Sequence, residues 1–352
     1  MLKTGQMRYE ELSQFAYQLP ERLVADTPAV PRDSARVFVY NTQTNEIVHS
    51  RFDRVLEFLA PDTVVVLNTT KVLPARLSLN RVTGGKVEVL VLLNESTPDR
   101  IAALIKQDAR NDEVLYLGTI PVVKVLSKSG PKYDIQWLHQ DSIVDFMKQY
   151  GTTPLPPYIK TNTQNESQKR ESYQSVFAEE SARYHSVAAP TASLHFTDSL
   201  LTRLKTRHTV VEVELAIGMG TFGLLKPHHF ETKSLHSEWV SMKHEQYEKL
   251  HHSTPVLAVG TTSIRTLESL PLLHHDSMGL SGWTDIFITP PHTFVYATQL
   301  LTNFHVSESS LMLLVEAFLQ HKGADLRLVD LYKIAIQENY RFYSLGDAML
   351  IV

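Results

Sequence analysis

The chain has 352 residues, of which 43 % are hydrophobic and 20 % are charged, proportions typical of a soluble protein with two domains, or with one large domain and an insertion. It contains no cysteine, which excludes disulfides, thiolate zinc sites, cysteine nucleophiles and cysteine-held iron–sulfur clusters. The formal net charge of −4 argues against general, charge-driven binding of nucleic acid but leaves room for a local basic patch.

The first residues, MLKTGQMRYEELSQF, lack the apolar core of a secretory signal peptide. No apolar run approaches the ~20 residues that a membrane-spanning helix needs. We therefore expect a cytoplasmic protein with no membrane contact.

The first part of the chain contains short β-branched runs of the kind found in strands. Residues 36–41 (RVFVYN) and 63–68 (TVVVLN) are two of them, and 84–94 (GGKVEVLVLLN) alternates before it becomes fully apolar. More strand candidates, with turn residues between them, follow in 113–138. Since no long helical period occurs from 71 to 138, this region is predicted to be a small antiparallel barrel or sandwich.

Two proline-bearing segments follow this region. Residues 150–174 carry three prolines within four residues and then a polar stretch, which predicts a linker followed by a mobile loop. Residues 185–197 (HSVAAPTASLHFT) are apolar enough for a core, yet Pro190 prevents a regular helix through their middle. This rigid run of small residues leads to His195.

The second half alternates strands with helices, as in a layered α/β domain. Thr197 is predicted to cap a helix over 198–207, with Asp198 favouring its positive end. Apolar residues at helical spacing predict a core helix over 310–320. The predicted strands cover 210–218, 255–260, 285–290 and the apolar C-terminus, 340–352. The sequence therefore predicts one α/β domain, interrupted after its first strands by a β-rich insert.

The run GMGTFG (218–223) follows a predicted strand and matches the G-x-G-x-x-G pattern of dinucleotide-binding proteins. That pattern requires a helix to open at the third glycine, and Pro227 would break such a helix near its start. What remains is a glycine-rich turn at Gly218 and Gly220 that lets the backbone approach a ligand.

The run AVGTTSIRTLES (258–269) is a better candidate for a binding site. A buried strand is predicted to end at Gly260, and Thr261 and Thr262 open a helix. Free N–H groups and the helix dipole at such a turn suit a carboxylate or phosphate, and Arg265 could add a bidentate clamp. The alternative is an ordinary capped turn in which Arg265 pairs with a glutamate, Glu268 or Glu238.

Isolated polar residues give weaker signals. His195, His236 and His305 could in principle form a metal cluster, but none has the short spacing of a zinc-binding helix. A lone histidine is more often a structural residue than a functional one. Asp347, at the start of the predicted last strand, is either a site residue or a turn aspartate.

Several stretches together resemble one family, the S-adenosylmethionine:tRNA ribosyltransferase-isomerases of queuosine biosynthesis. The matching runs, in the family's order, are YQLPERLVADTP, LNTTKVLPARL, GGKVEVLVL, TPLPPYI, SVAAPTASLHFT, GMGTF, LHSEW, AVGTTSIRTLES, TDIFITPP, LLTNFH and YRFYSLGDAML. Such a set over almost the whole chain is highly specific. Some positions depart from the family pattern, among them His185 and Ser193 in place of glycine and Glu308 in place of lysine.

The resemblance implies a layered α/β/α large domain, 1–70 and 151–352, with a small antiparallel β-barrel inserted at 71–150. It implies transfer and isomerisation of the ribosyl part of S-adenosylmethionine onto 7-aminomethyl-7-deazaguanine (preQ1) at the wobble position of tRNA. Adenine and methionine leave, and epoxyqueuosine forms. S-adenosylmethionine is then a consumed cosubstrate, no metal is needed, and tRNA is the partner, with no protein partner predicted. The departures leave open a paralogue with another acceptor, or a non-catalytic binder of S-adenosylmethionine or RNA.

This reaction needs a base to deprotonate the carbon next to the sulfonium and an acid for the leaving adenine. His195 is the most attractive base or acid, and the further candidates are His236, Glu238, His305 and Asp347. The turn at 260–265 suits the methionine carboxylate, and ribose hydroxyls or the base are expected at Thr191, Asp285 and Asn303. Phosphates of the anticodon loop are expected at Lys160, Lys169, Arg170, Arg203 and Arg207. Arg203 and Arg207 lie four residues apart and so share one face of the predicted helix. The alternative interpretation of these two arginines is a solvated helix end without a ligand.

Overall fold

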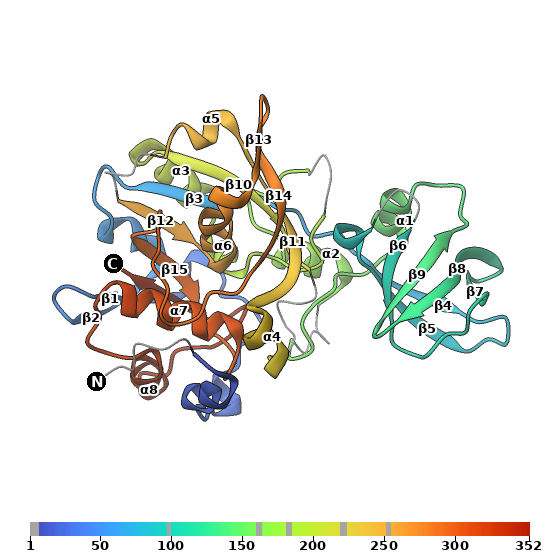
Figure 1. Ribbon diagram of the computed structural model, residues 1–352, viewed down its shortest axis with the longest axis horizontal. Helices are drawn as coiled ribbons and strands as arrows, with labels where there is room; N and C mark the ends of the chain where they lie inside the picture. The colour runs from blue at the N-terminus through green and yellow to red at the C-terminus, as the bar shows by residue number, and fades with distance from the viewer. Residues whose placement is uncertain (1–6, 97–99, 160–163, 181–184, 219–223, 251–254) are drawn as a thin grey trace.

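The computed structural model describes residues 7–96, 100–159, 164–180, 185–218, 224–250 and 255–352. Within these ranges the chain forms a large body and a smaller barrel that stands to one side of it (Figure 1). Strands from both before and after the barrel build the large body, so the barrel is an insertion. This confirms the predicted class, a layered α/β fold with an inserted antiparallel β-barrel.

A ten-stranded mixed sheet forms the large body, in the order β13-β14-β11-β10-β3-β12-β15-β16-β1-β2. Its strands are β1 (Arg36–Asn41), β2 (Glu46–Arg51), β3 (Val64–Asn68), β10 (Val210–Ala216), β11 (Ser234–Lys243), β12 (Val256–Val259), β13 (His274–Asp276), β14 (Gly279–Ile286), β15 (Gln299–Asn303) and β16 (Ala348–Ile351). The strands β10, β3, β12 and β15 run parallel at the centre. The C-terminal strand β16 is inserted between β15 and β1, as the apolar C-terminus predicts.

Helices of two kinds surround the sheets. The α-helices are α1 (Ile143–Tyr150), α2 (Glu166–Ser172), α3 (Asp198–Arg207), α4 (Pro227–Thr232), α5 (His244–Tyr247), α6 (Thr261–Ser269), α7 (Ser310–His321) and α8 (Leu328–Gln337). The short 3-10 helices are η1 (Tyr9–Phe15), η2 (Glu21–Leu23), η3 (Arg32–Ser34), η4 (Phe52–Phe58), η5 (Leu93–Glu95), η6 (Thr191–His195) and η8 (Leu270–Leu272). The predicted cap of α3 is confirmed, because the Thr197 side chain accepts a hydrogen bond from the Leu200 N–H.

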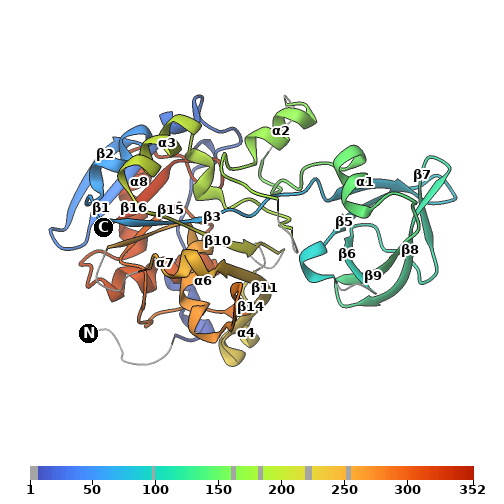
Figure 2. The same cartoon turned by 90° about the horizontal axis from the view of Figure 1, so that it is seen from above.

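The central strands are buried on both faces, because alternate residues of β3 belong to different cores. Val64 and Val66 pack in one cluster with residues of α6, α7 and α8. Val65 and Leu67 pack in another cluster with residues of α3 and η4. A strand covered on both sides reads as a continuous apolar run, as VVVL does here. In Figure 2, α3 and α6 accordingly lie on opposite sides of the sheet, which is the predicted three-layer arrangement.

The inserted strands close into a barrel in the order β4-β5-β6-β9-β8-β7. They are β4 (Arg76–Asn80), β5 (Lys86–Val91), β6 (Ile101–Ile105), β7 (Val114–Leu117), β8 (Ile120–Ser129) and β9 (Lys132–Trp137). Every pair is antiparallel, and closure leaves no edge strand exposed. Phe146 and Met147 of α1 pack into the barrel core. The limits of 71 and 150 for this domain remain a prediction.

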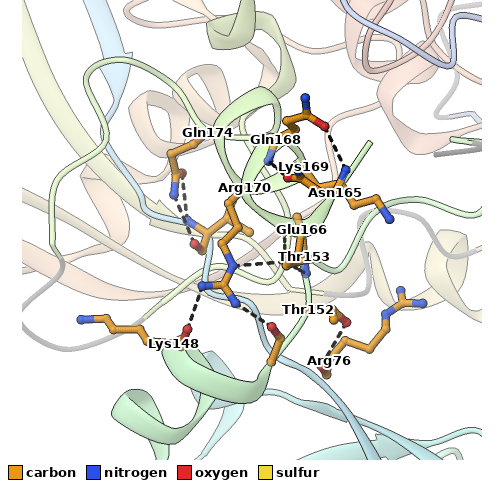
Figure 3. A network of polar contacts seen from close by, with 12 residues as sticks. Arg76, Lys148, Thr152, Thr153, Asn165, Glu166, Gln168, Lys169, Arg170 and Gln174 are labelled. Carbon is orange, nitrogen blue, oxygen red and sulfur yellow. Dashed lines mark hydrogen bonds and ion pairs between the residues drawn. The ribbon is translucent and has the colours of Figure 1, made fainter. Parts of the chain in front are cut away.

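The chain enters and leaves the barrel at one point. Arg76 and Thr152 exchange backbone hydrogen bonds there, at 3.2 and 2.8 Å. A Cβ on Gly151 would lie 1.9 Å from the Pro74 carbonyl oxygen, so this crossing requires glycine. Figure 3 shows Arg170 at the centre of the polar network around this point, bonded to the carbonyl oxygens of Lys148 and Gly151 at 2.7 and 2.6 Å.

Two local predictions are wrong. Part of the segment 150–174, predicted to be a mobile loop after the linker, is the helix α2, which Asn165 caps by accepting a hydrogen bond from the Gln168 N–H. The strand predicted over 285–290 does not form as a separate element. Its first two residues are instead the end of the longer strand β14, which stops at Ile286. None of the helices in the described ranges combines the length and apolar character that crossing a bilayer requires.

Candidate active site

The carboxyl ends of β12 and β15 lie side by side in the parallel part of the sheet. After β12, Gly260 adopts a φ of 89°, and α6 begins directly at Thr261. The positive φ favours glycine and directs the free N–H groups of α6 to this edge of the sheet. After β15, Asn303 lies opposite Ala348 of β16. Ligands of open α/β sheets bind outside the carboxyl ends of such strands.

A cleft lies at this edge of the sheet. The space inside it, including the part open to solvent, is about 1130 Å³, which is enough for a ligand the size of a nucleoside. Most of its surface is apolar, with Tyr158, Phe304 and Tyr343 among the lining residues. Six residues predicted for the site line it, namely Thr191, Gly260, Thr261, Thr262, Asn303 and His305. Three separate parts of the sequence therefore meet in one cleft.

Asn303 connects the cleft to His195. Its Oδ1 accepts a hydrogen bond of 2.8 Å from the Thr191 hydroxyl, which fixes the orientation of the amide. Its Nδ2 then donates toward the Tyr343 carbonyl oxygen and lies 3.4 Å from Nε2 of His195. His195 itself is buried against the ring of Phe52, with the ring centroids 4.8 Å apart. The imidazole therefore lies behind Asn303 and is not part of the cleft lining.

Both buried histidines are neutral at physiological pH. Burial, with smaller contributions from the positive charges of Arg341 and Arg32, lowers the pKa of His195 to about 3. Burial alone lowers the pKa of His305 to about 3. The His305 imidazole Nε2 lies 2.8 Å from the Thr302 hydroxyl, and its backbone N–H donates to the Tyr332 hydroxyl at 2.8 Å. Neither histidine carries a proton that it could donate as an imidazolium.

A second, smaller cavity adjoins the cleft, and Leu311 lines both. His236, Glu238 and Arg265 line this smaller cavity. Arg265 Nη1 donates to Glu238 in an ion pair whose side chains are 6 % and 2 % exposed. Glu238 also accepts a hydrogen bond of 2.8 Å from the Gly218 N–H. Of the alternatives for Arg265, the pair with Glu238 is the one that forms.

Arg265 can still bind an anion while it is paired with Glu238. Its Nε and Nη2 have no hydrogen-bond partner among the described residues. These two atoms form one edge of the guanidinium and match a carboxylate bidentately. The hydroxyl of Thr262, one turn earlier on α6, is also buried without a partner. The other glutamate, Glu268, accepts hydrogen bonds from the backbone of Val295 instead.

Three of the residues predicted for the site are placed elsewhere or outside the described ranges. Asp347 accepts hydrogen bonds from the N–H groups of Arg36 and Arg341 at 2.9 and 2.7 Å, so it ties β16 to its neighbours. Asp285 is exposed on β14 and lines neither cavity. Gly220 lies outside the described residues, as does Lys160 of the predicted phosphate contacts.

Two kinds of cleft-lining residue were not predicted from the sequence. Tyr158 lines the cleft and bonds to the hydroxyl of Ser344, and the prolines before it are the signal that this segment is held rigidly. Tyr343 and Glu308 also line the cleft and adopt left-handed backbone with φ of 73° and 58°. Strain of this kind at non-glycine residues clusters at functional sites, and it has no local sequence signal.

The chain is similar to known proteins over almost its whole length. A family model described as "Queuosine biosynthesis protein" matches residues 12–351. The chain belongs to this family. The S-adenosylmethionine:tRNA ribosyltransferase-isomerase of Thermosipho africanus is 38 % identical over 97 % of this chain and 99 % of its own length. The protein of the same name from Campylobacter jejuni is 36 % identical over 97 % and 98 %.

A solved structure is also similar to this chain. It is the crystal structure of the S-adenosylmethionine tRNA ribosyltransferase from Thermotoga maritima, 27 % identical, with a TM-score of 0.53 over 97 % of this chain and all of that one. Membership of the queuosine biosynthesis family is therefore supported by sequence and by fold. The resemblance on which the sequence analysis rested is confirmed.

Proposed function

We propose that this protein transfers and isomerises the ribosyl moiety of S-adenosylmethionine onto a tRNA base, and that it is an S-adenosylmethionine:tRNA ribosyltransferase-isomerase. The acceptor is preQ1 at the wobble position, the product is epoxyqueuosine, and adenine and methionine are released. The observation that carries the proposal is the single cleft in which Thr191, the 260–262 turn, Asn303 and His305 meet. Relatives of this name match the chain over nearly its full length.

The cleft suits S-adenosylmethionine because its polar groups are few and lie at one edge of an apolar wall. The N-terminus of α6 and the free edge of Arg265 are suited to the methionine carboxylate. The Thr191 hydroxyl and the Asn303 amide are suited to the ribose hydroxyls. The apolar wall excludes water, which would otherwise compete with the acceptor amine for the activated ribose.

The candidate acid–base groups fall into two sets. His305 lines the cleft with a neutral imidazole, but the burial that lowers its pKa to about 3 also makes it a weak base. It is therefore better suited to hydrogen bonding with the reactants than to removing the proton beside the sulfonium. His195 acts through Asn303, because its Nε2 faces the amide rather than the cleft. Glu238 and His236 lie in the adjoining cavity and can serve the leaving base or the acceptor. Asp347 and Asp285 are left with structural or peripheral roles.

We propose further that S-adenosylmethionine is consumed as a cosubstrate and that no metal takes part. tRNA is the partner, and the protein works in the cytoplasm, where tRNA is modified. Arg170 is committed to the junction shown in Figure 3, so Lys169, Arg203 and Arg207 remain the better candidates for phosphate contacts. Arg203 already donates to the carbonyl oxygen of Asp53.

A second candidate is a paralogue that keeps S-adenosylmethionine and uses another acceptor. The observation that favours it is Glu308, an exposed anion in the cleft lining at a position where the family pattern has lysine. A carboxylate there repels an anticodon phosphate and attracts a cationic acceptor.

The experiment that tests the proposal is incubation of the protein with S-adenosylmethionine and preQ1-tRNA, with free adenine measured by chromatography. We expect adenine release that requires both substrates and matches epoxyqueuosine in amount. Release with S-adenosylmethionine and a cationic small molecule but not with preQ1-tRNA supports the paralogue. Binding of S-adenosylmethionine without turnover on any acceptor contradicts both enzymatic proposals.

A further inference from the structure

The barrel places one buried polar side chain, Asn94, against the large domain at Gly218. Asn94 lies on η5, in the connection between β5 and β6, where η5 packs against β11. It is 0 % exposed, and neither Nδ2 nor Oδ1 has a hydrogen-bond partner among the described residues. Burying an amide with neither polar atom hydrogen-bonded costs free energy, and such groups are rare in folded proteins.

Asn94 reaches the large domain at Gly218. A Cβ built on Gly218 would lie 3.0 Å from Asn94 Nδ2, 3.4 Å from Glu95 Oε1 and 3.8 Å from Glu238 Oε1. The two carboxylate distances are ordinary contacts, whereas the Asn94 distance is tight, so a side chain at 218 would have to displace the Asn94 amide slightly. The backbone at Gly218 therefore lies between Asn94 of the barrel and Glu238, which pairs with Arg265.

The groups left without partners here come from both domains. The Gly218 N–H bonds to Glu238, and Glu238 holds Nη1 of Arg265. Nε and Nη2 of Arg265 and both polar atoms of Asn94 remain unpaired among the described residues. The cluster thus offers adjacent donors from the guanidinium, and a donor next to an acceptor from the amide.

Such a set of groups matches a planar nitrogen heterocycle. An asparagine amide pairs bidentately with a base edge that presents a donor beside an acceptor. A carboxylate or a phosphate presents acceptors alone and would leave Asn94 Oδ1 unpaired. Enzymes that modify a base read it in a pocket by contacts of this kind.

We infer that Asn94 of the barrel contacts a nucleobase edge in the site formed with Gly218, Glu238 and Arg265, and so determines specificity. The inference rests on the proposed function. The heterocycle is either the deazaguanine of the acceptor or the adenine of S-adenosylmethionine, which share this edge chemistry. The barrel then takes part in recognition of the reactants themselves.

The test compares the wild-type protein with Asn94→Leu, which keeps the approximate volume and removes both polar atoms. Because no hydrogen bond is lost in the free protein, we expect an unchanged or higher midpoint of thermal unfolding. We expect a loss of about 10- to 100-fold in affinity for one heterocycle. The matched control is Asn80→Ala, in the β4–β5 hairpin at the opposite end of β5 from η5, which should change neither affinity.

Two titrations show which heterocycle Asn94 contacts, the deazaguanine of the acceptor or the adenine of S-adenosylmethionine. A raised KM for preQ1-tRNA, with the same loss for free preQ1 base by calorimetry and an unchanged Kd for S-adenosylmethionine, assigns Asn94 to the acceptor. A raised Kd for S-adenosylmethionine alone assigns it to adenine. Changes below twofold in both, with cooperative unfolding intact, overturn the inference.

The two binding measurements, for free preQ1 base and for S-adenosylmethionine, require no catalytic turnover. They therefore test the role of Asn94 even if the wild-type protein proves inactive and the proposed function fails. If Asn94→Leu does not fold, a crystal structure of the wild-type protein with S-adenosylmethionine and free preQ1 base decides. We expect Asn94 within 3.2 Å, about the limit of a hydrogen bond, of a nitrogen or oxygen of one base. Both bases bound without that contact overturn the inference.

Discussion

At the scale of single residues, the buried ion pair of Glu238 and Arg265 is the most consequential polar contact near the cleft. Both side chains are almost fully buried, so removal of one partner leaves the other charge without compensation. From the sequence, Arg265 could pair with Glu268, one turn further along the same helix, or with Glu238, 27 residues earlier in the chain. Only the antiparallel pairing of β10 with β11 brings Glu238 to the Gly218 N–H.

The first prediction concerns this pair. Arg265→Leu should lower the free energy of unfolding by about 3–5 kcal/mol, since it leaves the Glu238 carboxylate buried and unpaired. The double variant Arg265→Leu with Glu238→Leu should recover most of that loss. Urea unfolding followed by circular dichroism measures both. The exposed pair of Arg54 and Glu57 gives the control, because Arg54→Leu should have almost no effect. A double variant as unstable as the single one contradicts the role assigned to the pair.

The second prediction concerns the two buried histidines. Each has a folded pKa of about 3 and a normal pKa near 6.5 when unfolded, so the unfolded state binds more protons between these values. Stability is therefore complete above pH 6.5 and falls as pH decreases, by about 2 kcal/mol per histidine at pH 5. His195→Gln should reduce the pH dependence of the unfolding free energy between pH 5 and 6 by one proton. The exposed His244→Gln should leave it unchanged, and equal slopes in all three proteins would refute the expectation.

At the scale of elements, the sequence predicted strands and helices well wherever periodicity was strong. The runs at 36–41 and 63–68 become β1 and β3 because β-branched residues occupy consecutive buried positions. The rigid segment 185–197 becomes η6 followed by the Thr197 cap. The helix α2 was missed because it is short and polar. Its tertiary contacts join Glu166 to Thr153 and Arg170 to the carbonyl oxygens of Lys148 and Gly151.

The third prediction concerns these contacts (Figure 3). Arg170→Ala removes the bonds to the carbonyl oxygens at the end of α1 and should destabilise the barrel junction by about 1–3 kcal/mol. Limited proteolysis should then cut between α1 and α2 faster than in the wild-type protein. Lys169→Ala is the control, because Lys169 enters the network through its backbone. If Arg170→Ala instead weakens tRNA binding and reduces its salt dependence without faster cleavage, Arg170 is a phosphate contact.

At the scale of the whole molecule, the cleft is assembled from segments far apart in the chain. The sequence pointed to Gly260 because a predicted strand ends there, and to Thr191 and Asn303 through the family resemblance. It gave no indication of the role proposed for Asn94, since the contact between η5 and β11 joins segments far apart in the chain. Asp347, also a candidate from the sequence, accepts two backbone hydrogen bonds that tie β16 to its neighbours.

The fourth prediction concerns the charge of the cleft rim. If the exposed Glu308 faces RNA, Glu308→Lys should strengthen tRNA binding and steepen its dependence on salt by the equivalent of about one phosphate contact. Affinities measured over a series of salt concentrations give this slope. Glu46→Lys, an exposed charge reversal on β2, is the control and should change the slope much less. An unchanged slope for Glu308→Lys would indicate that this part of the cleft does not face tRNA.

The most direct measurement is a crystal structure of the protein with S-adenosylmethionine bound. We expect the methionine carboxylate at the N-terminus of α6, near the free edge of Arg265, and the ribose hydroxyls at Thr191 and Asn303. Electron density for S-adenosylmethionine outside this cleft, with Thr191 and Asn303 free of contact to it, would contradict the central claim that this edge of the sheet is the active site.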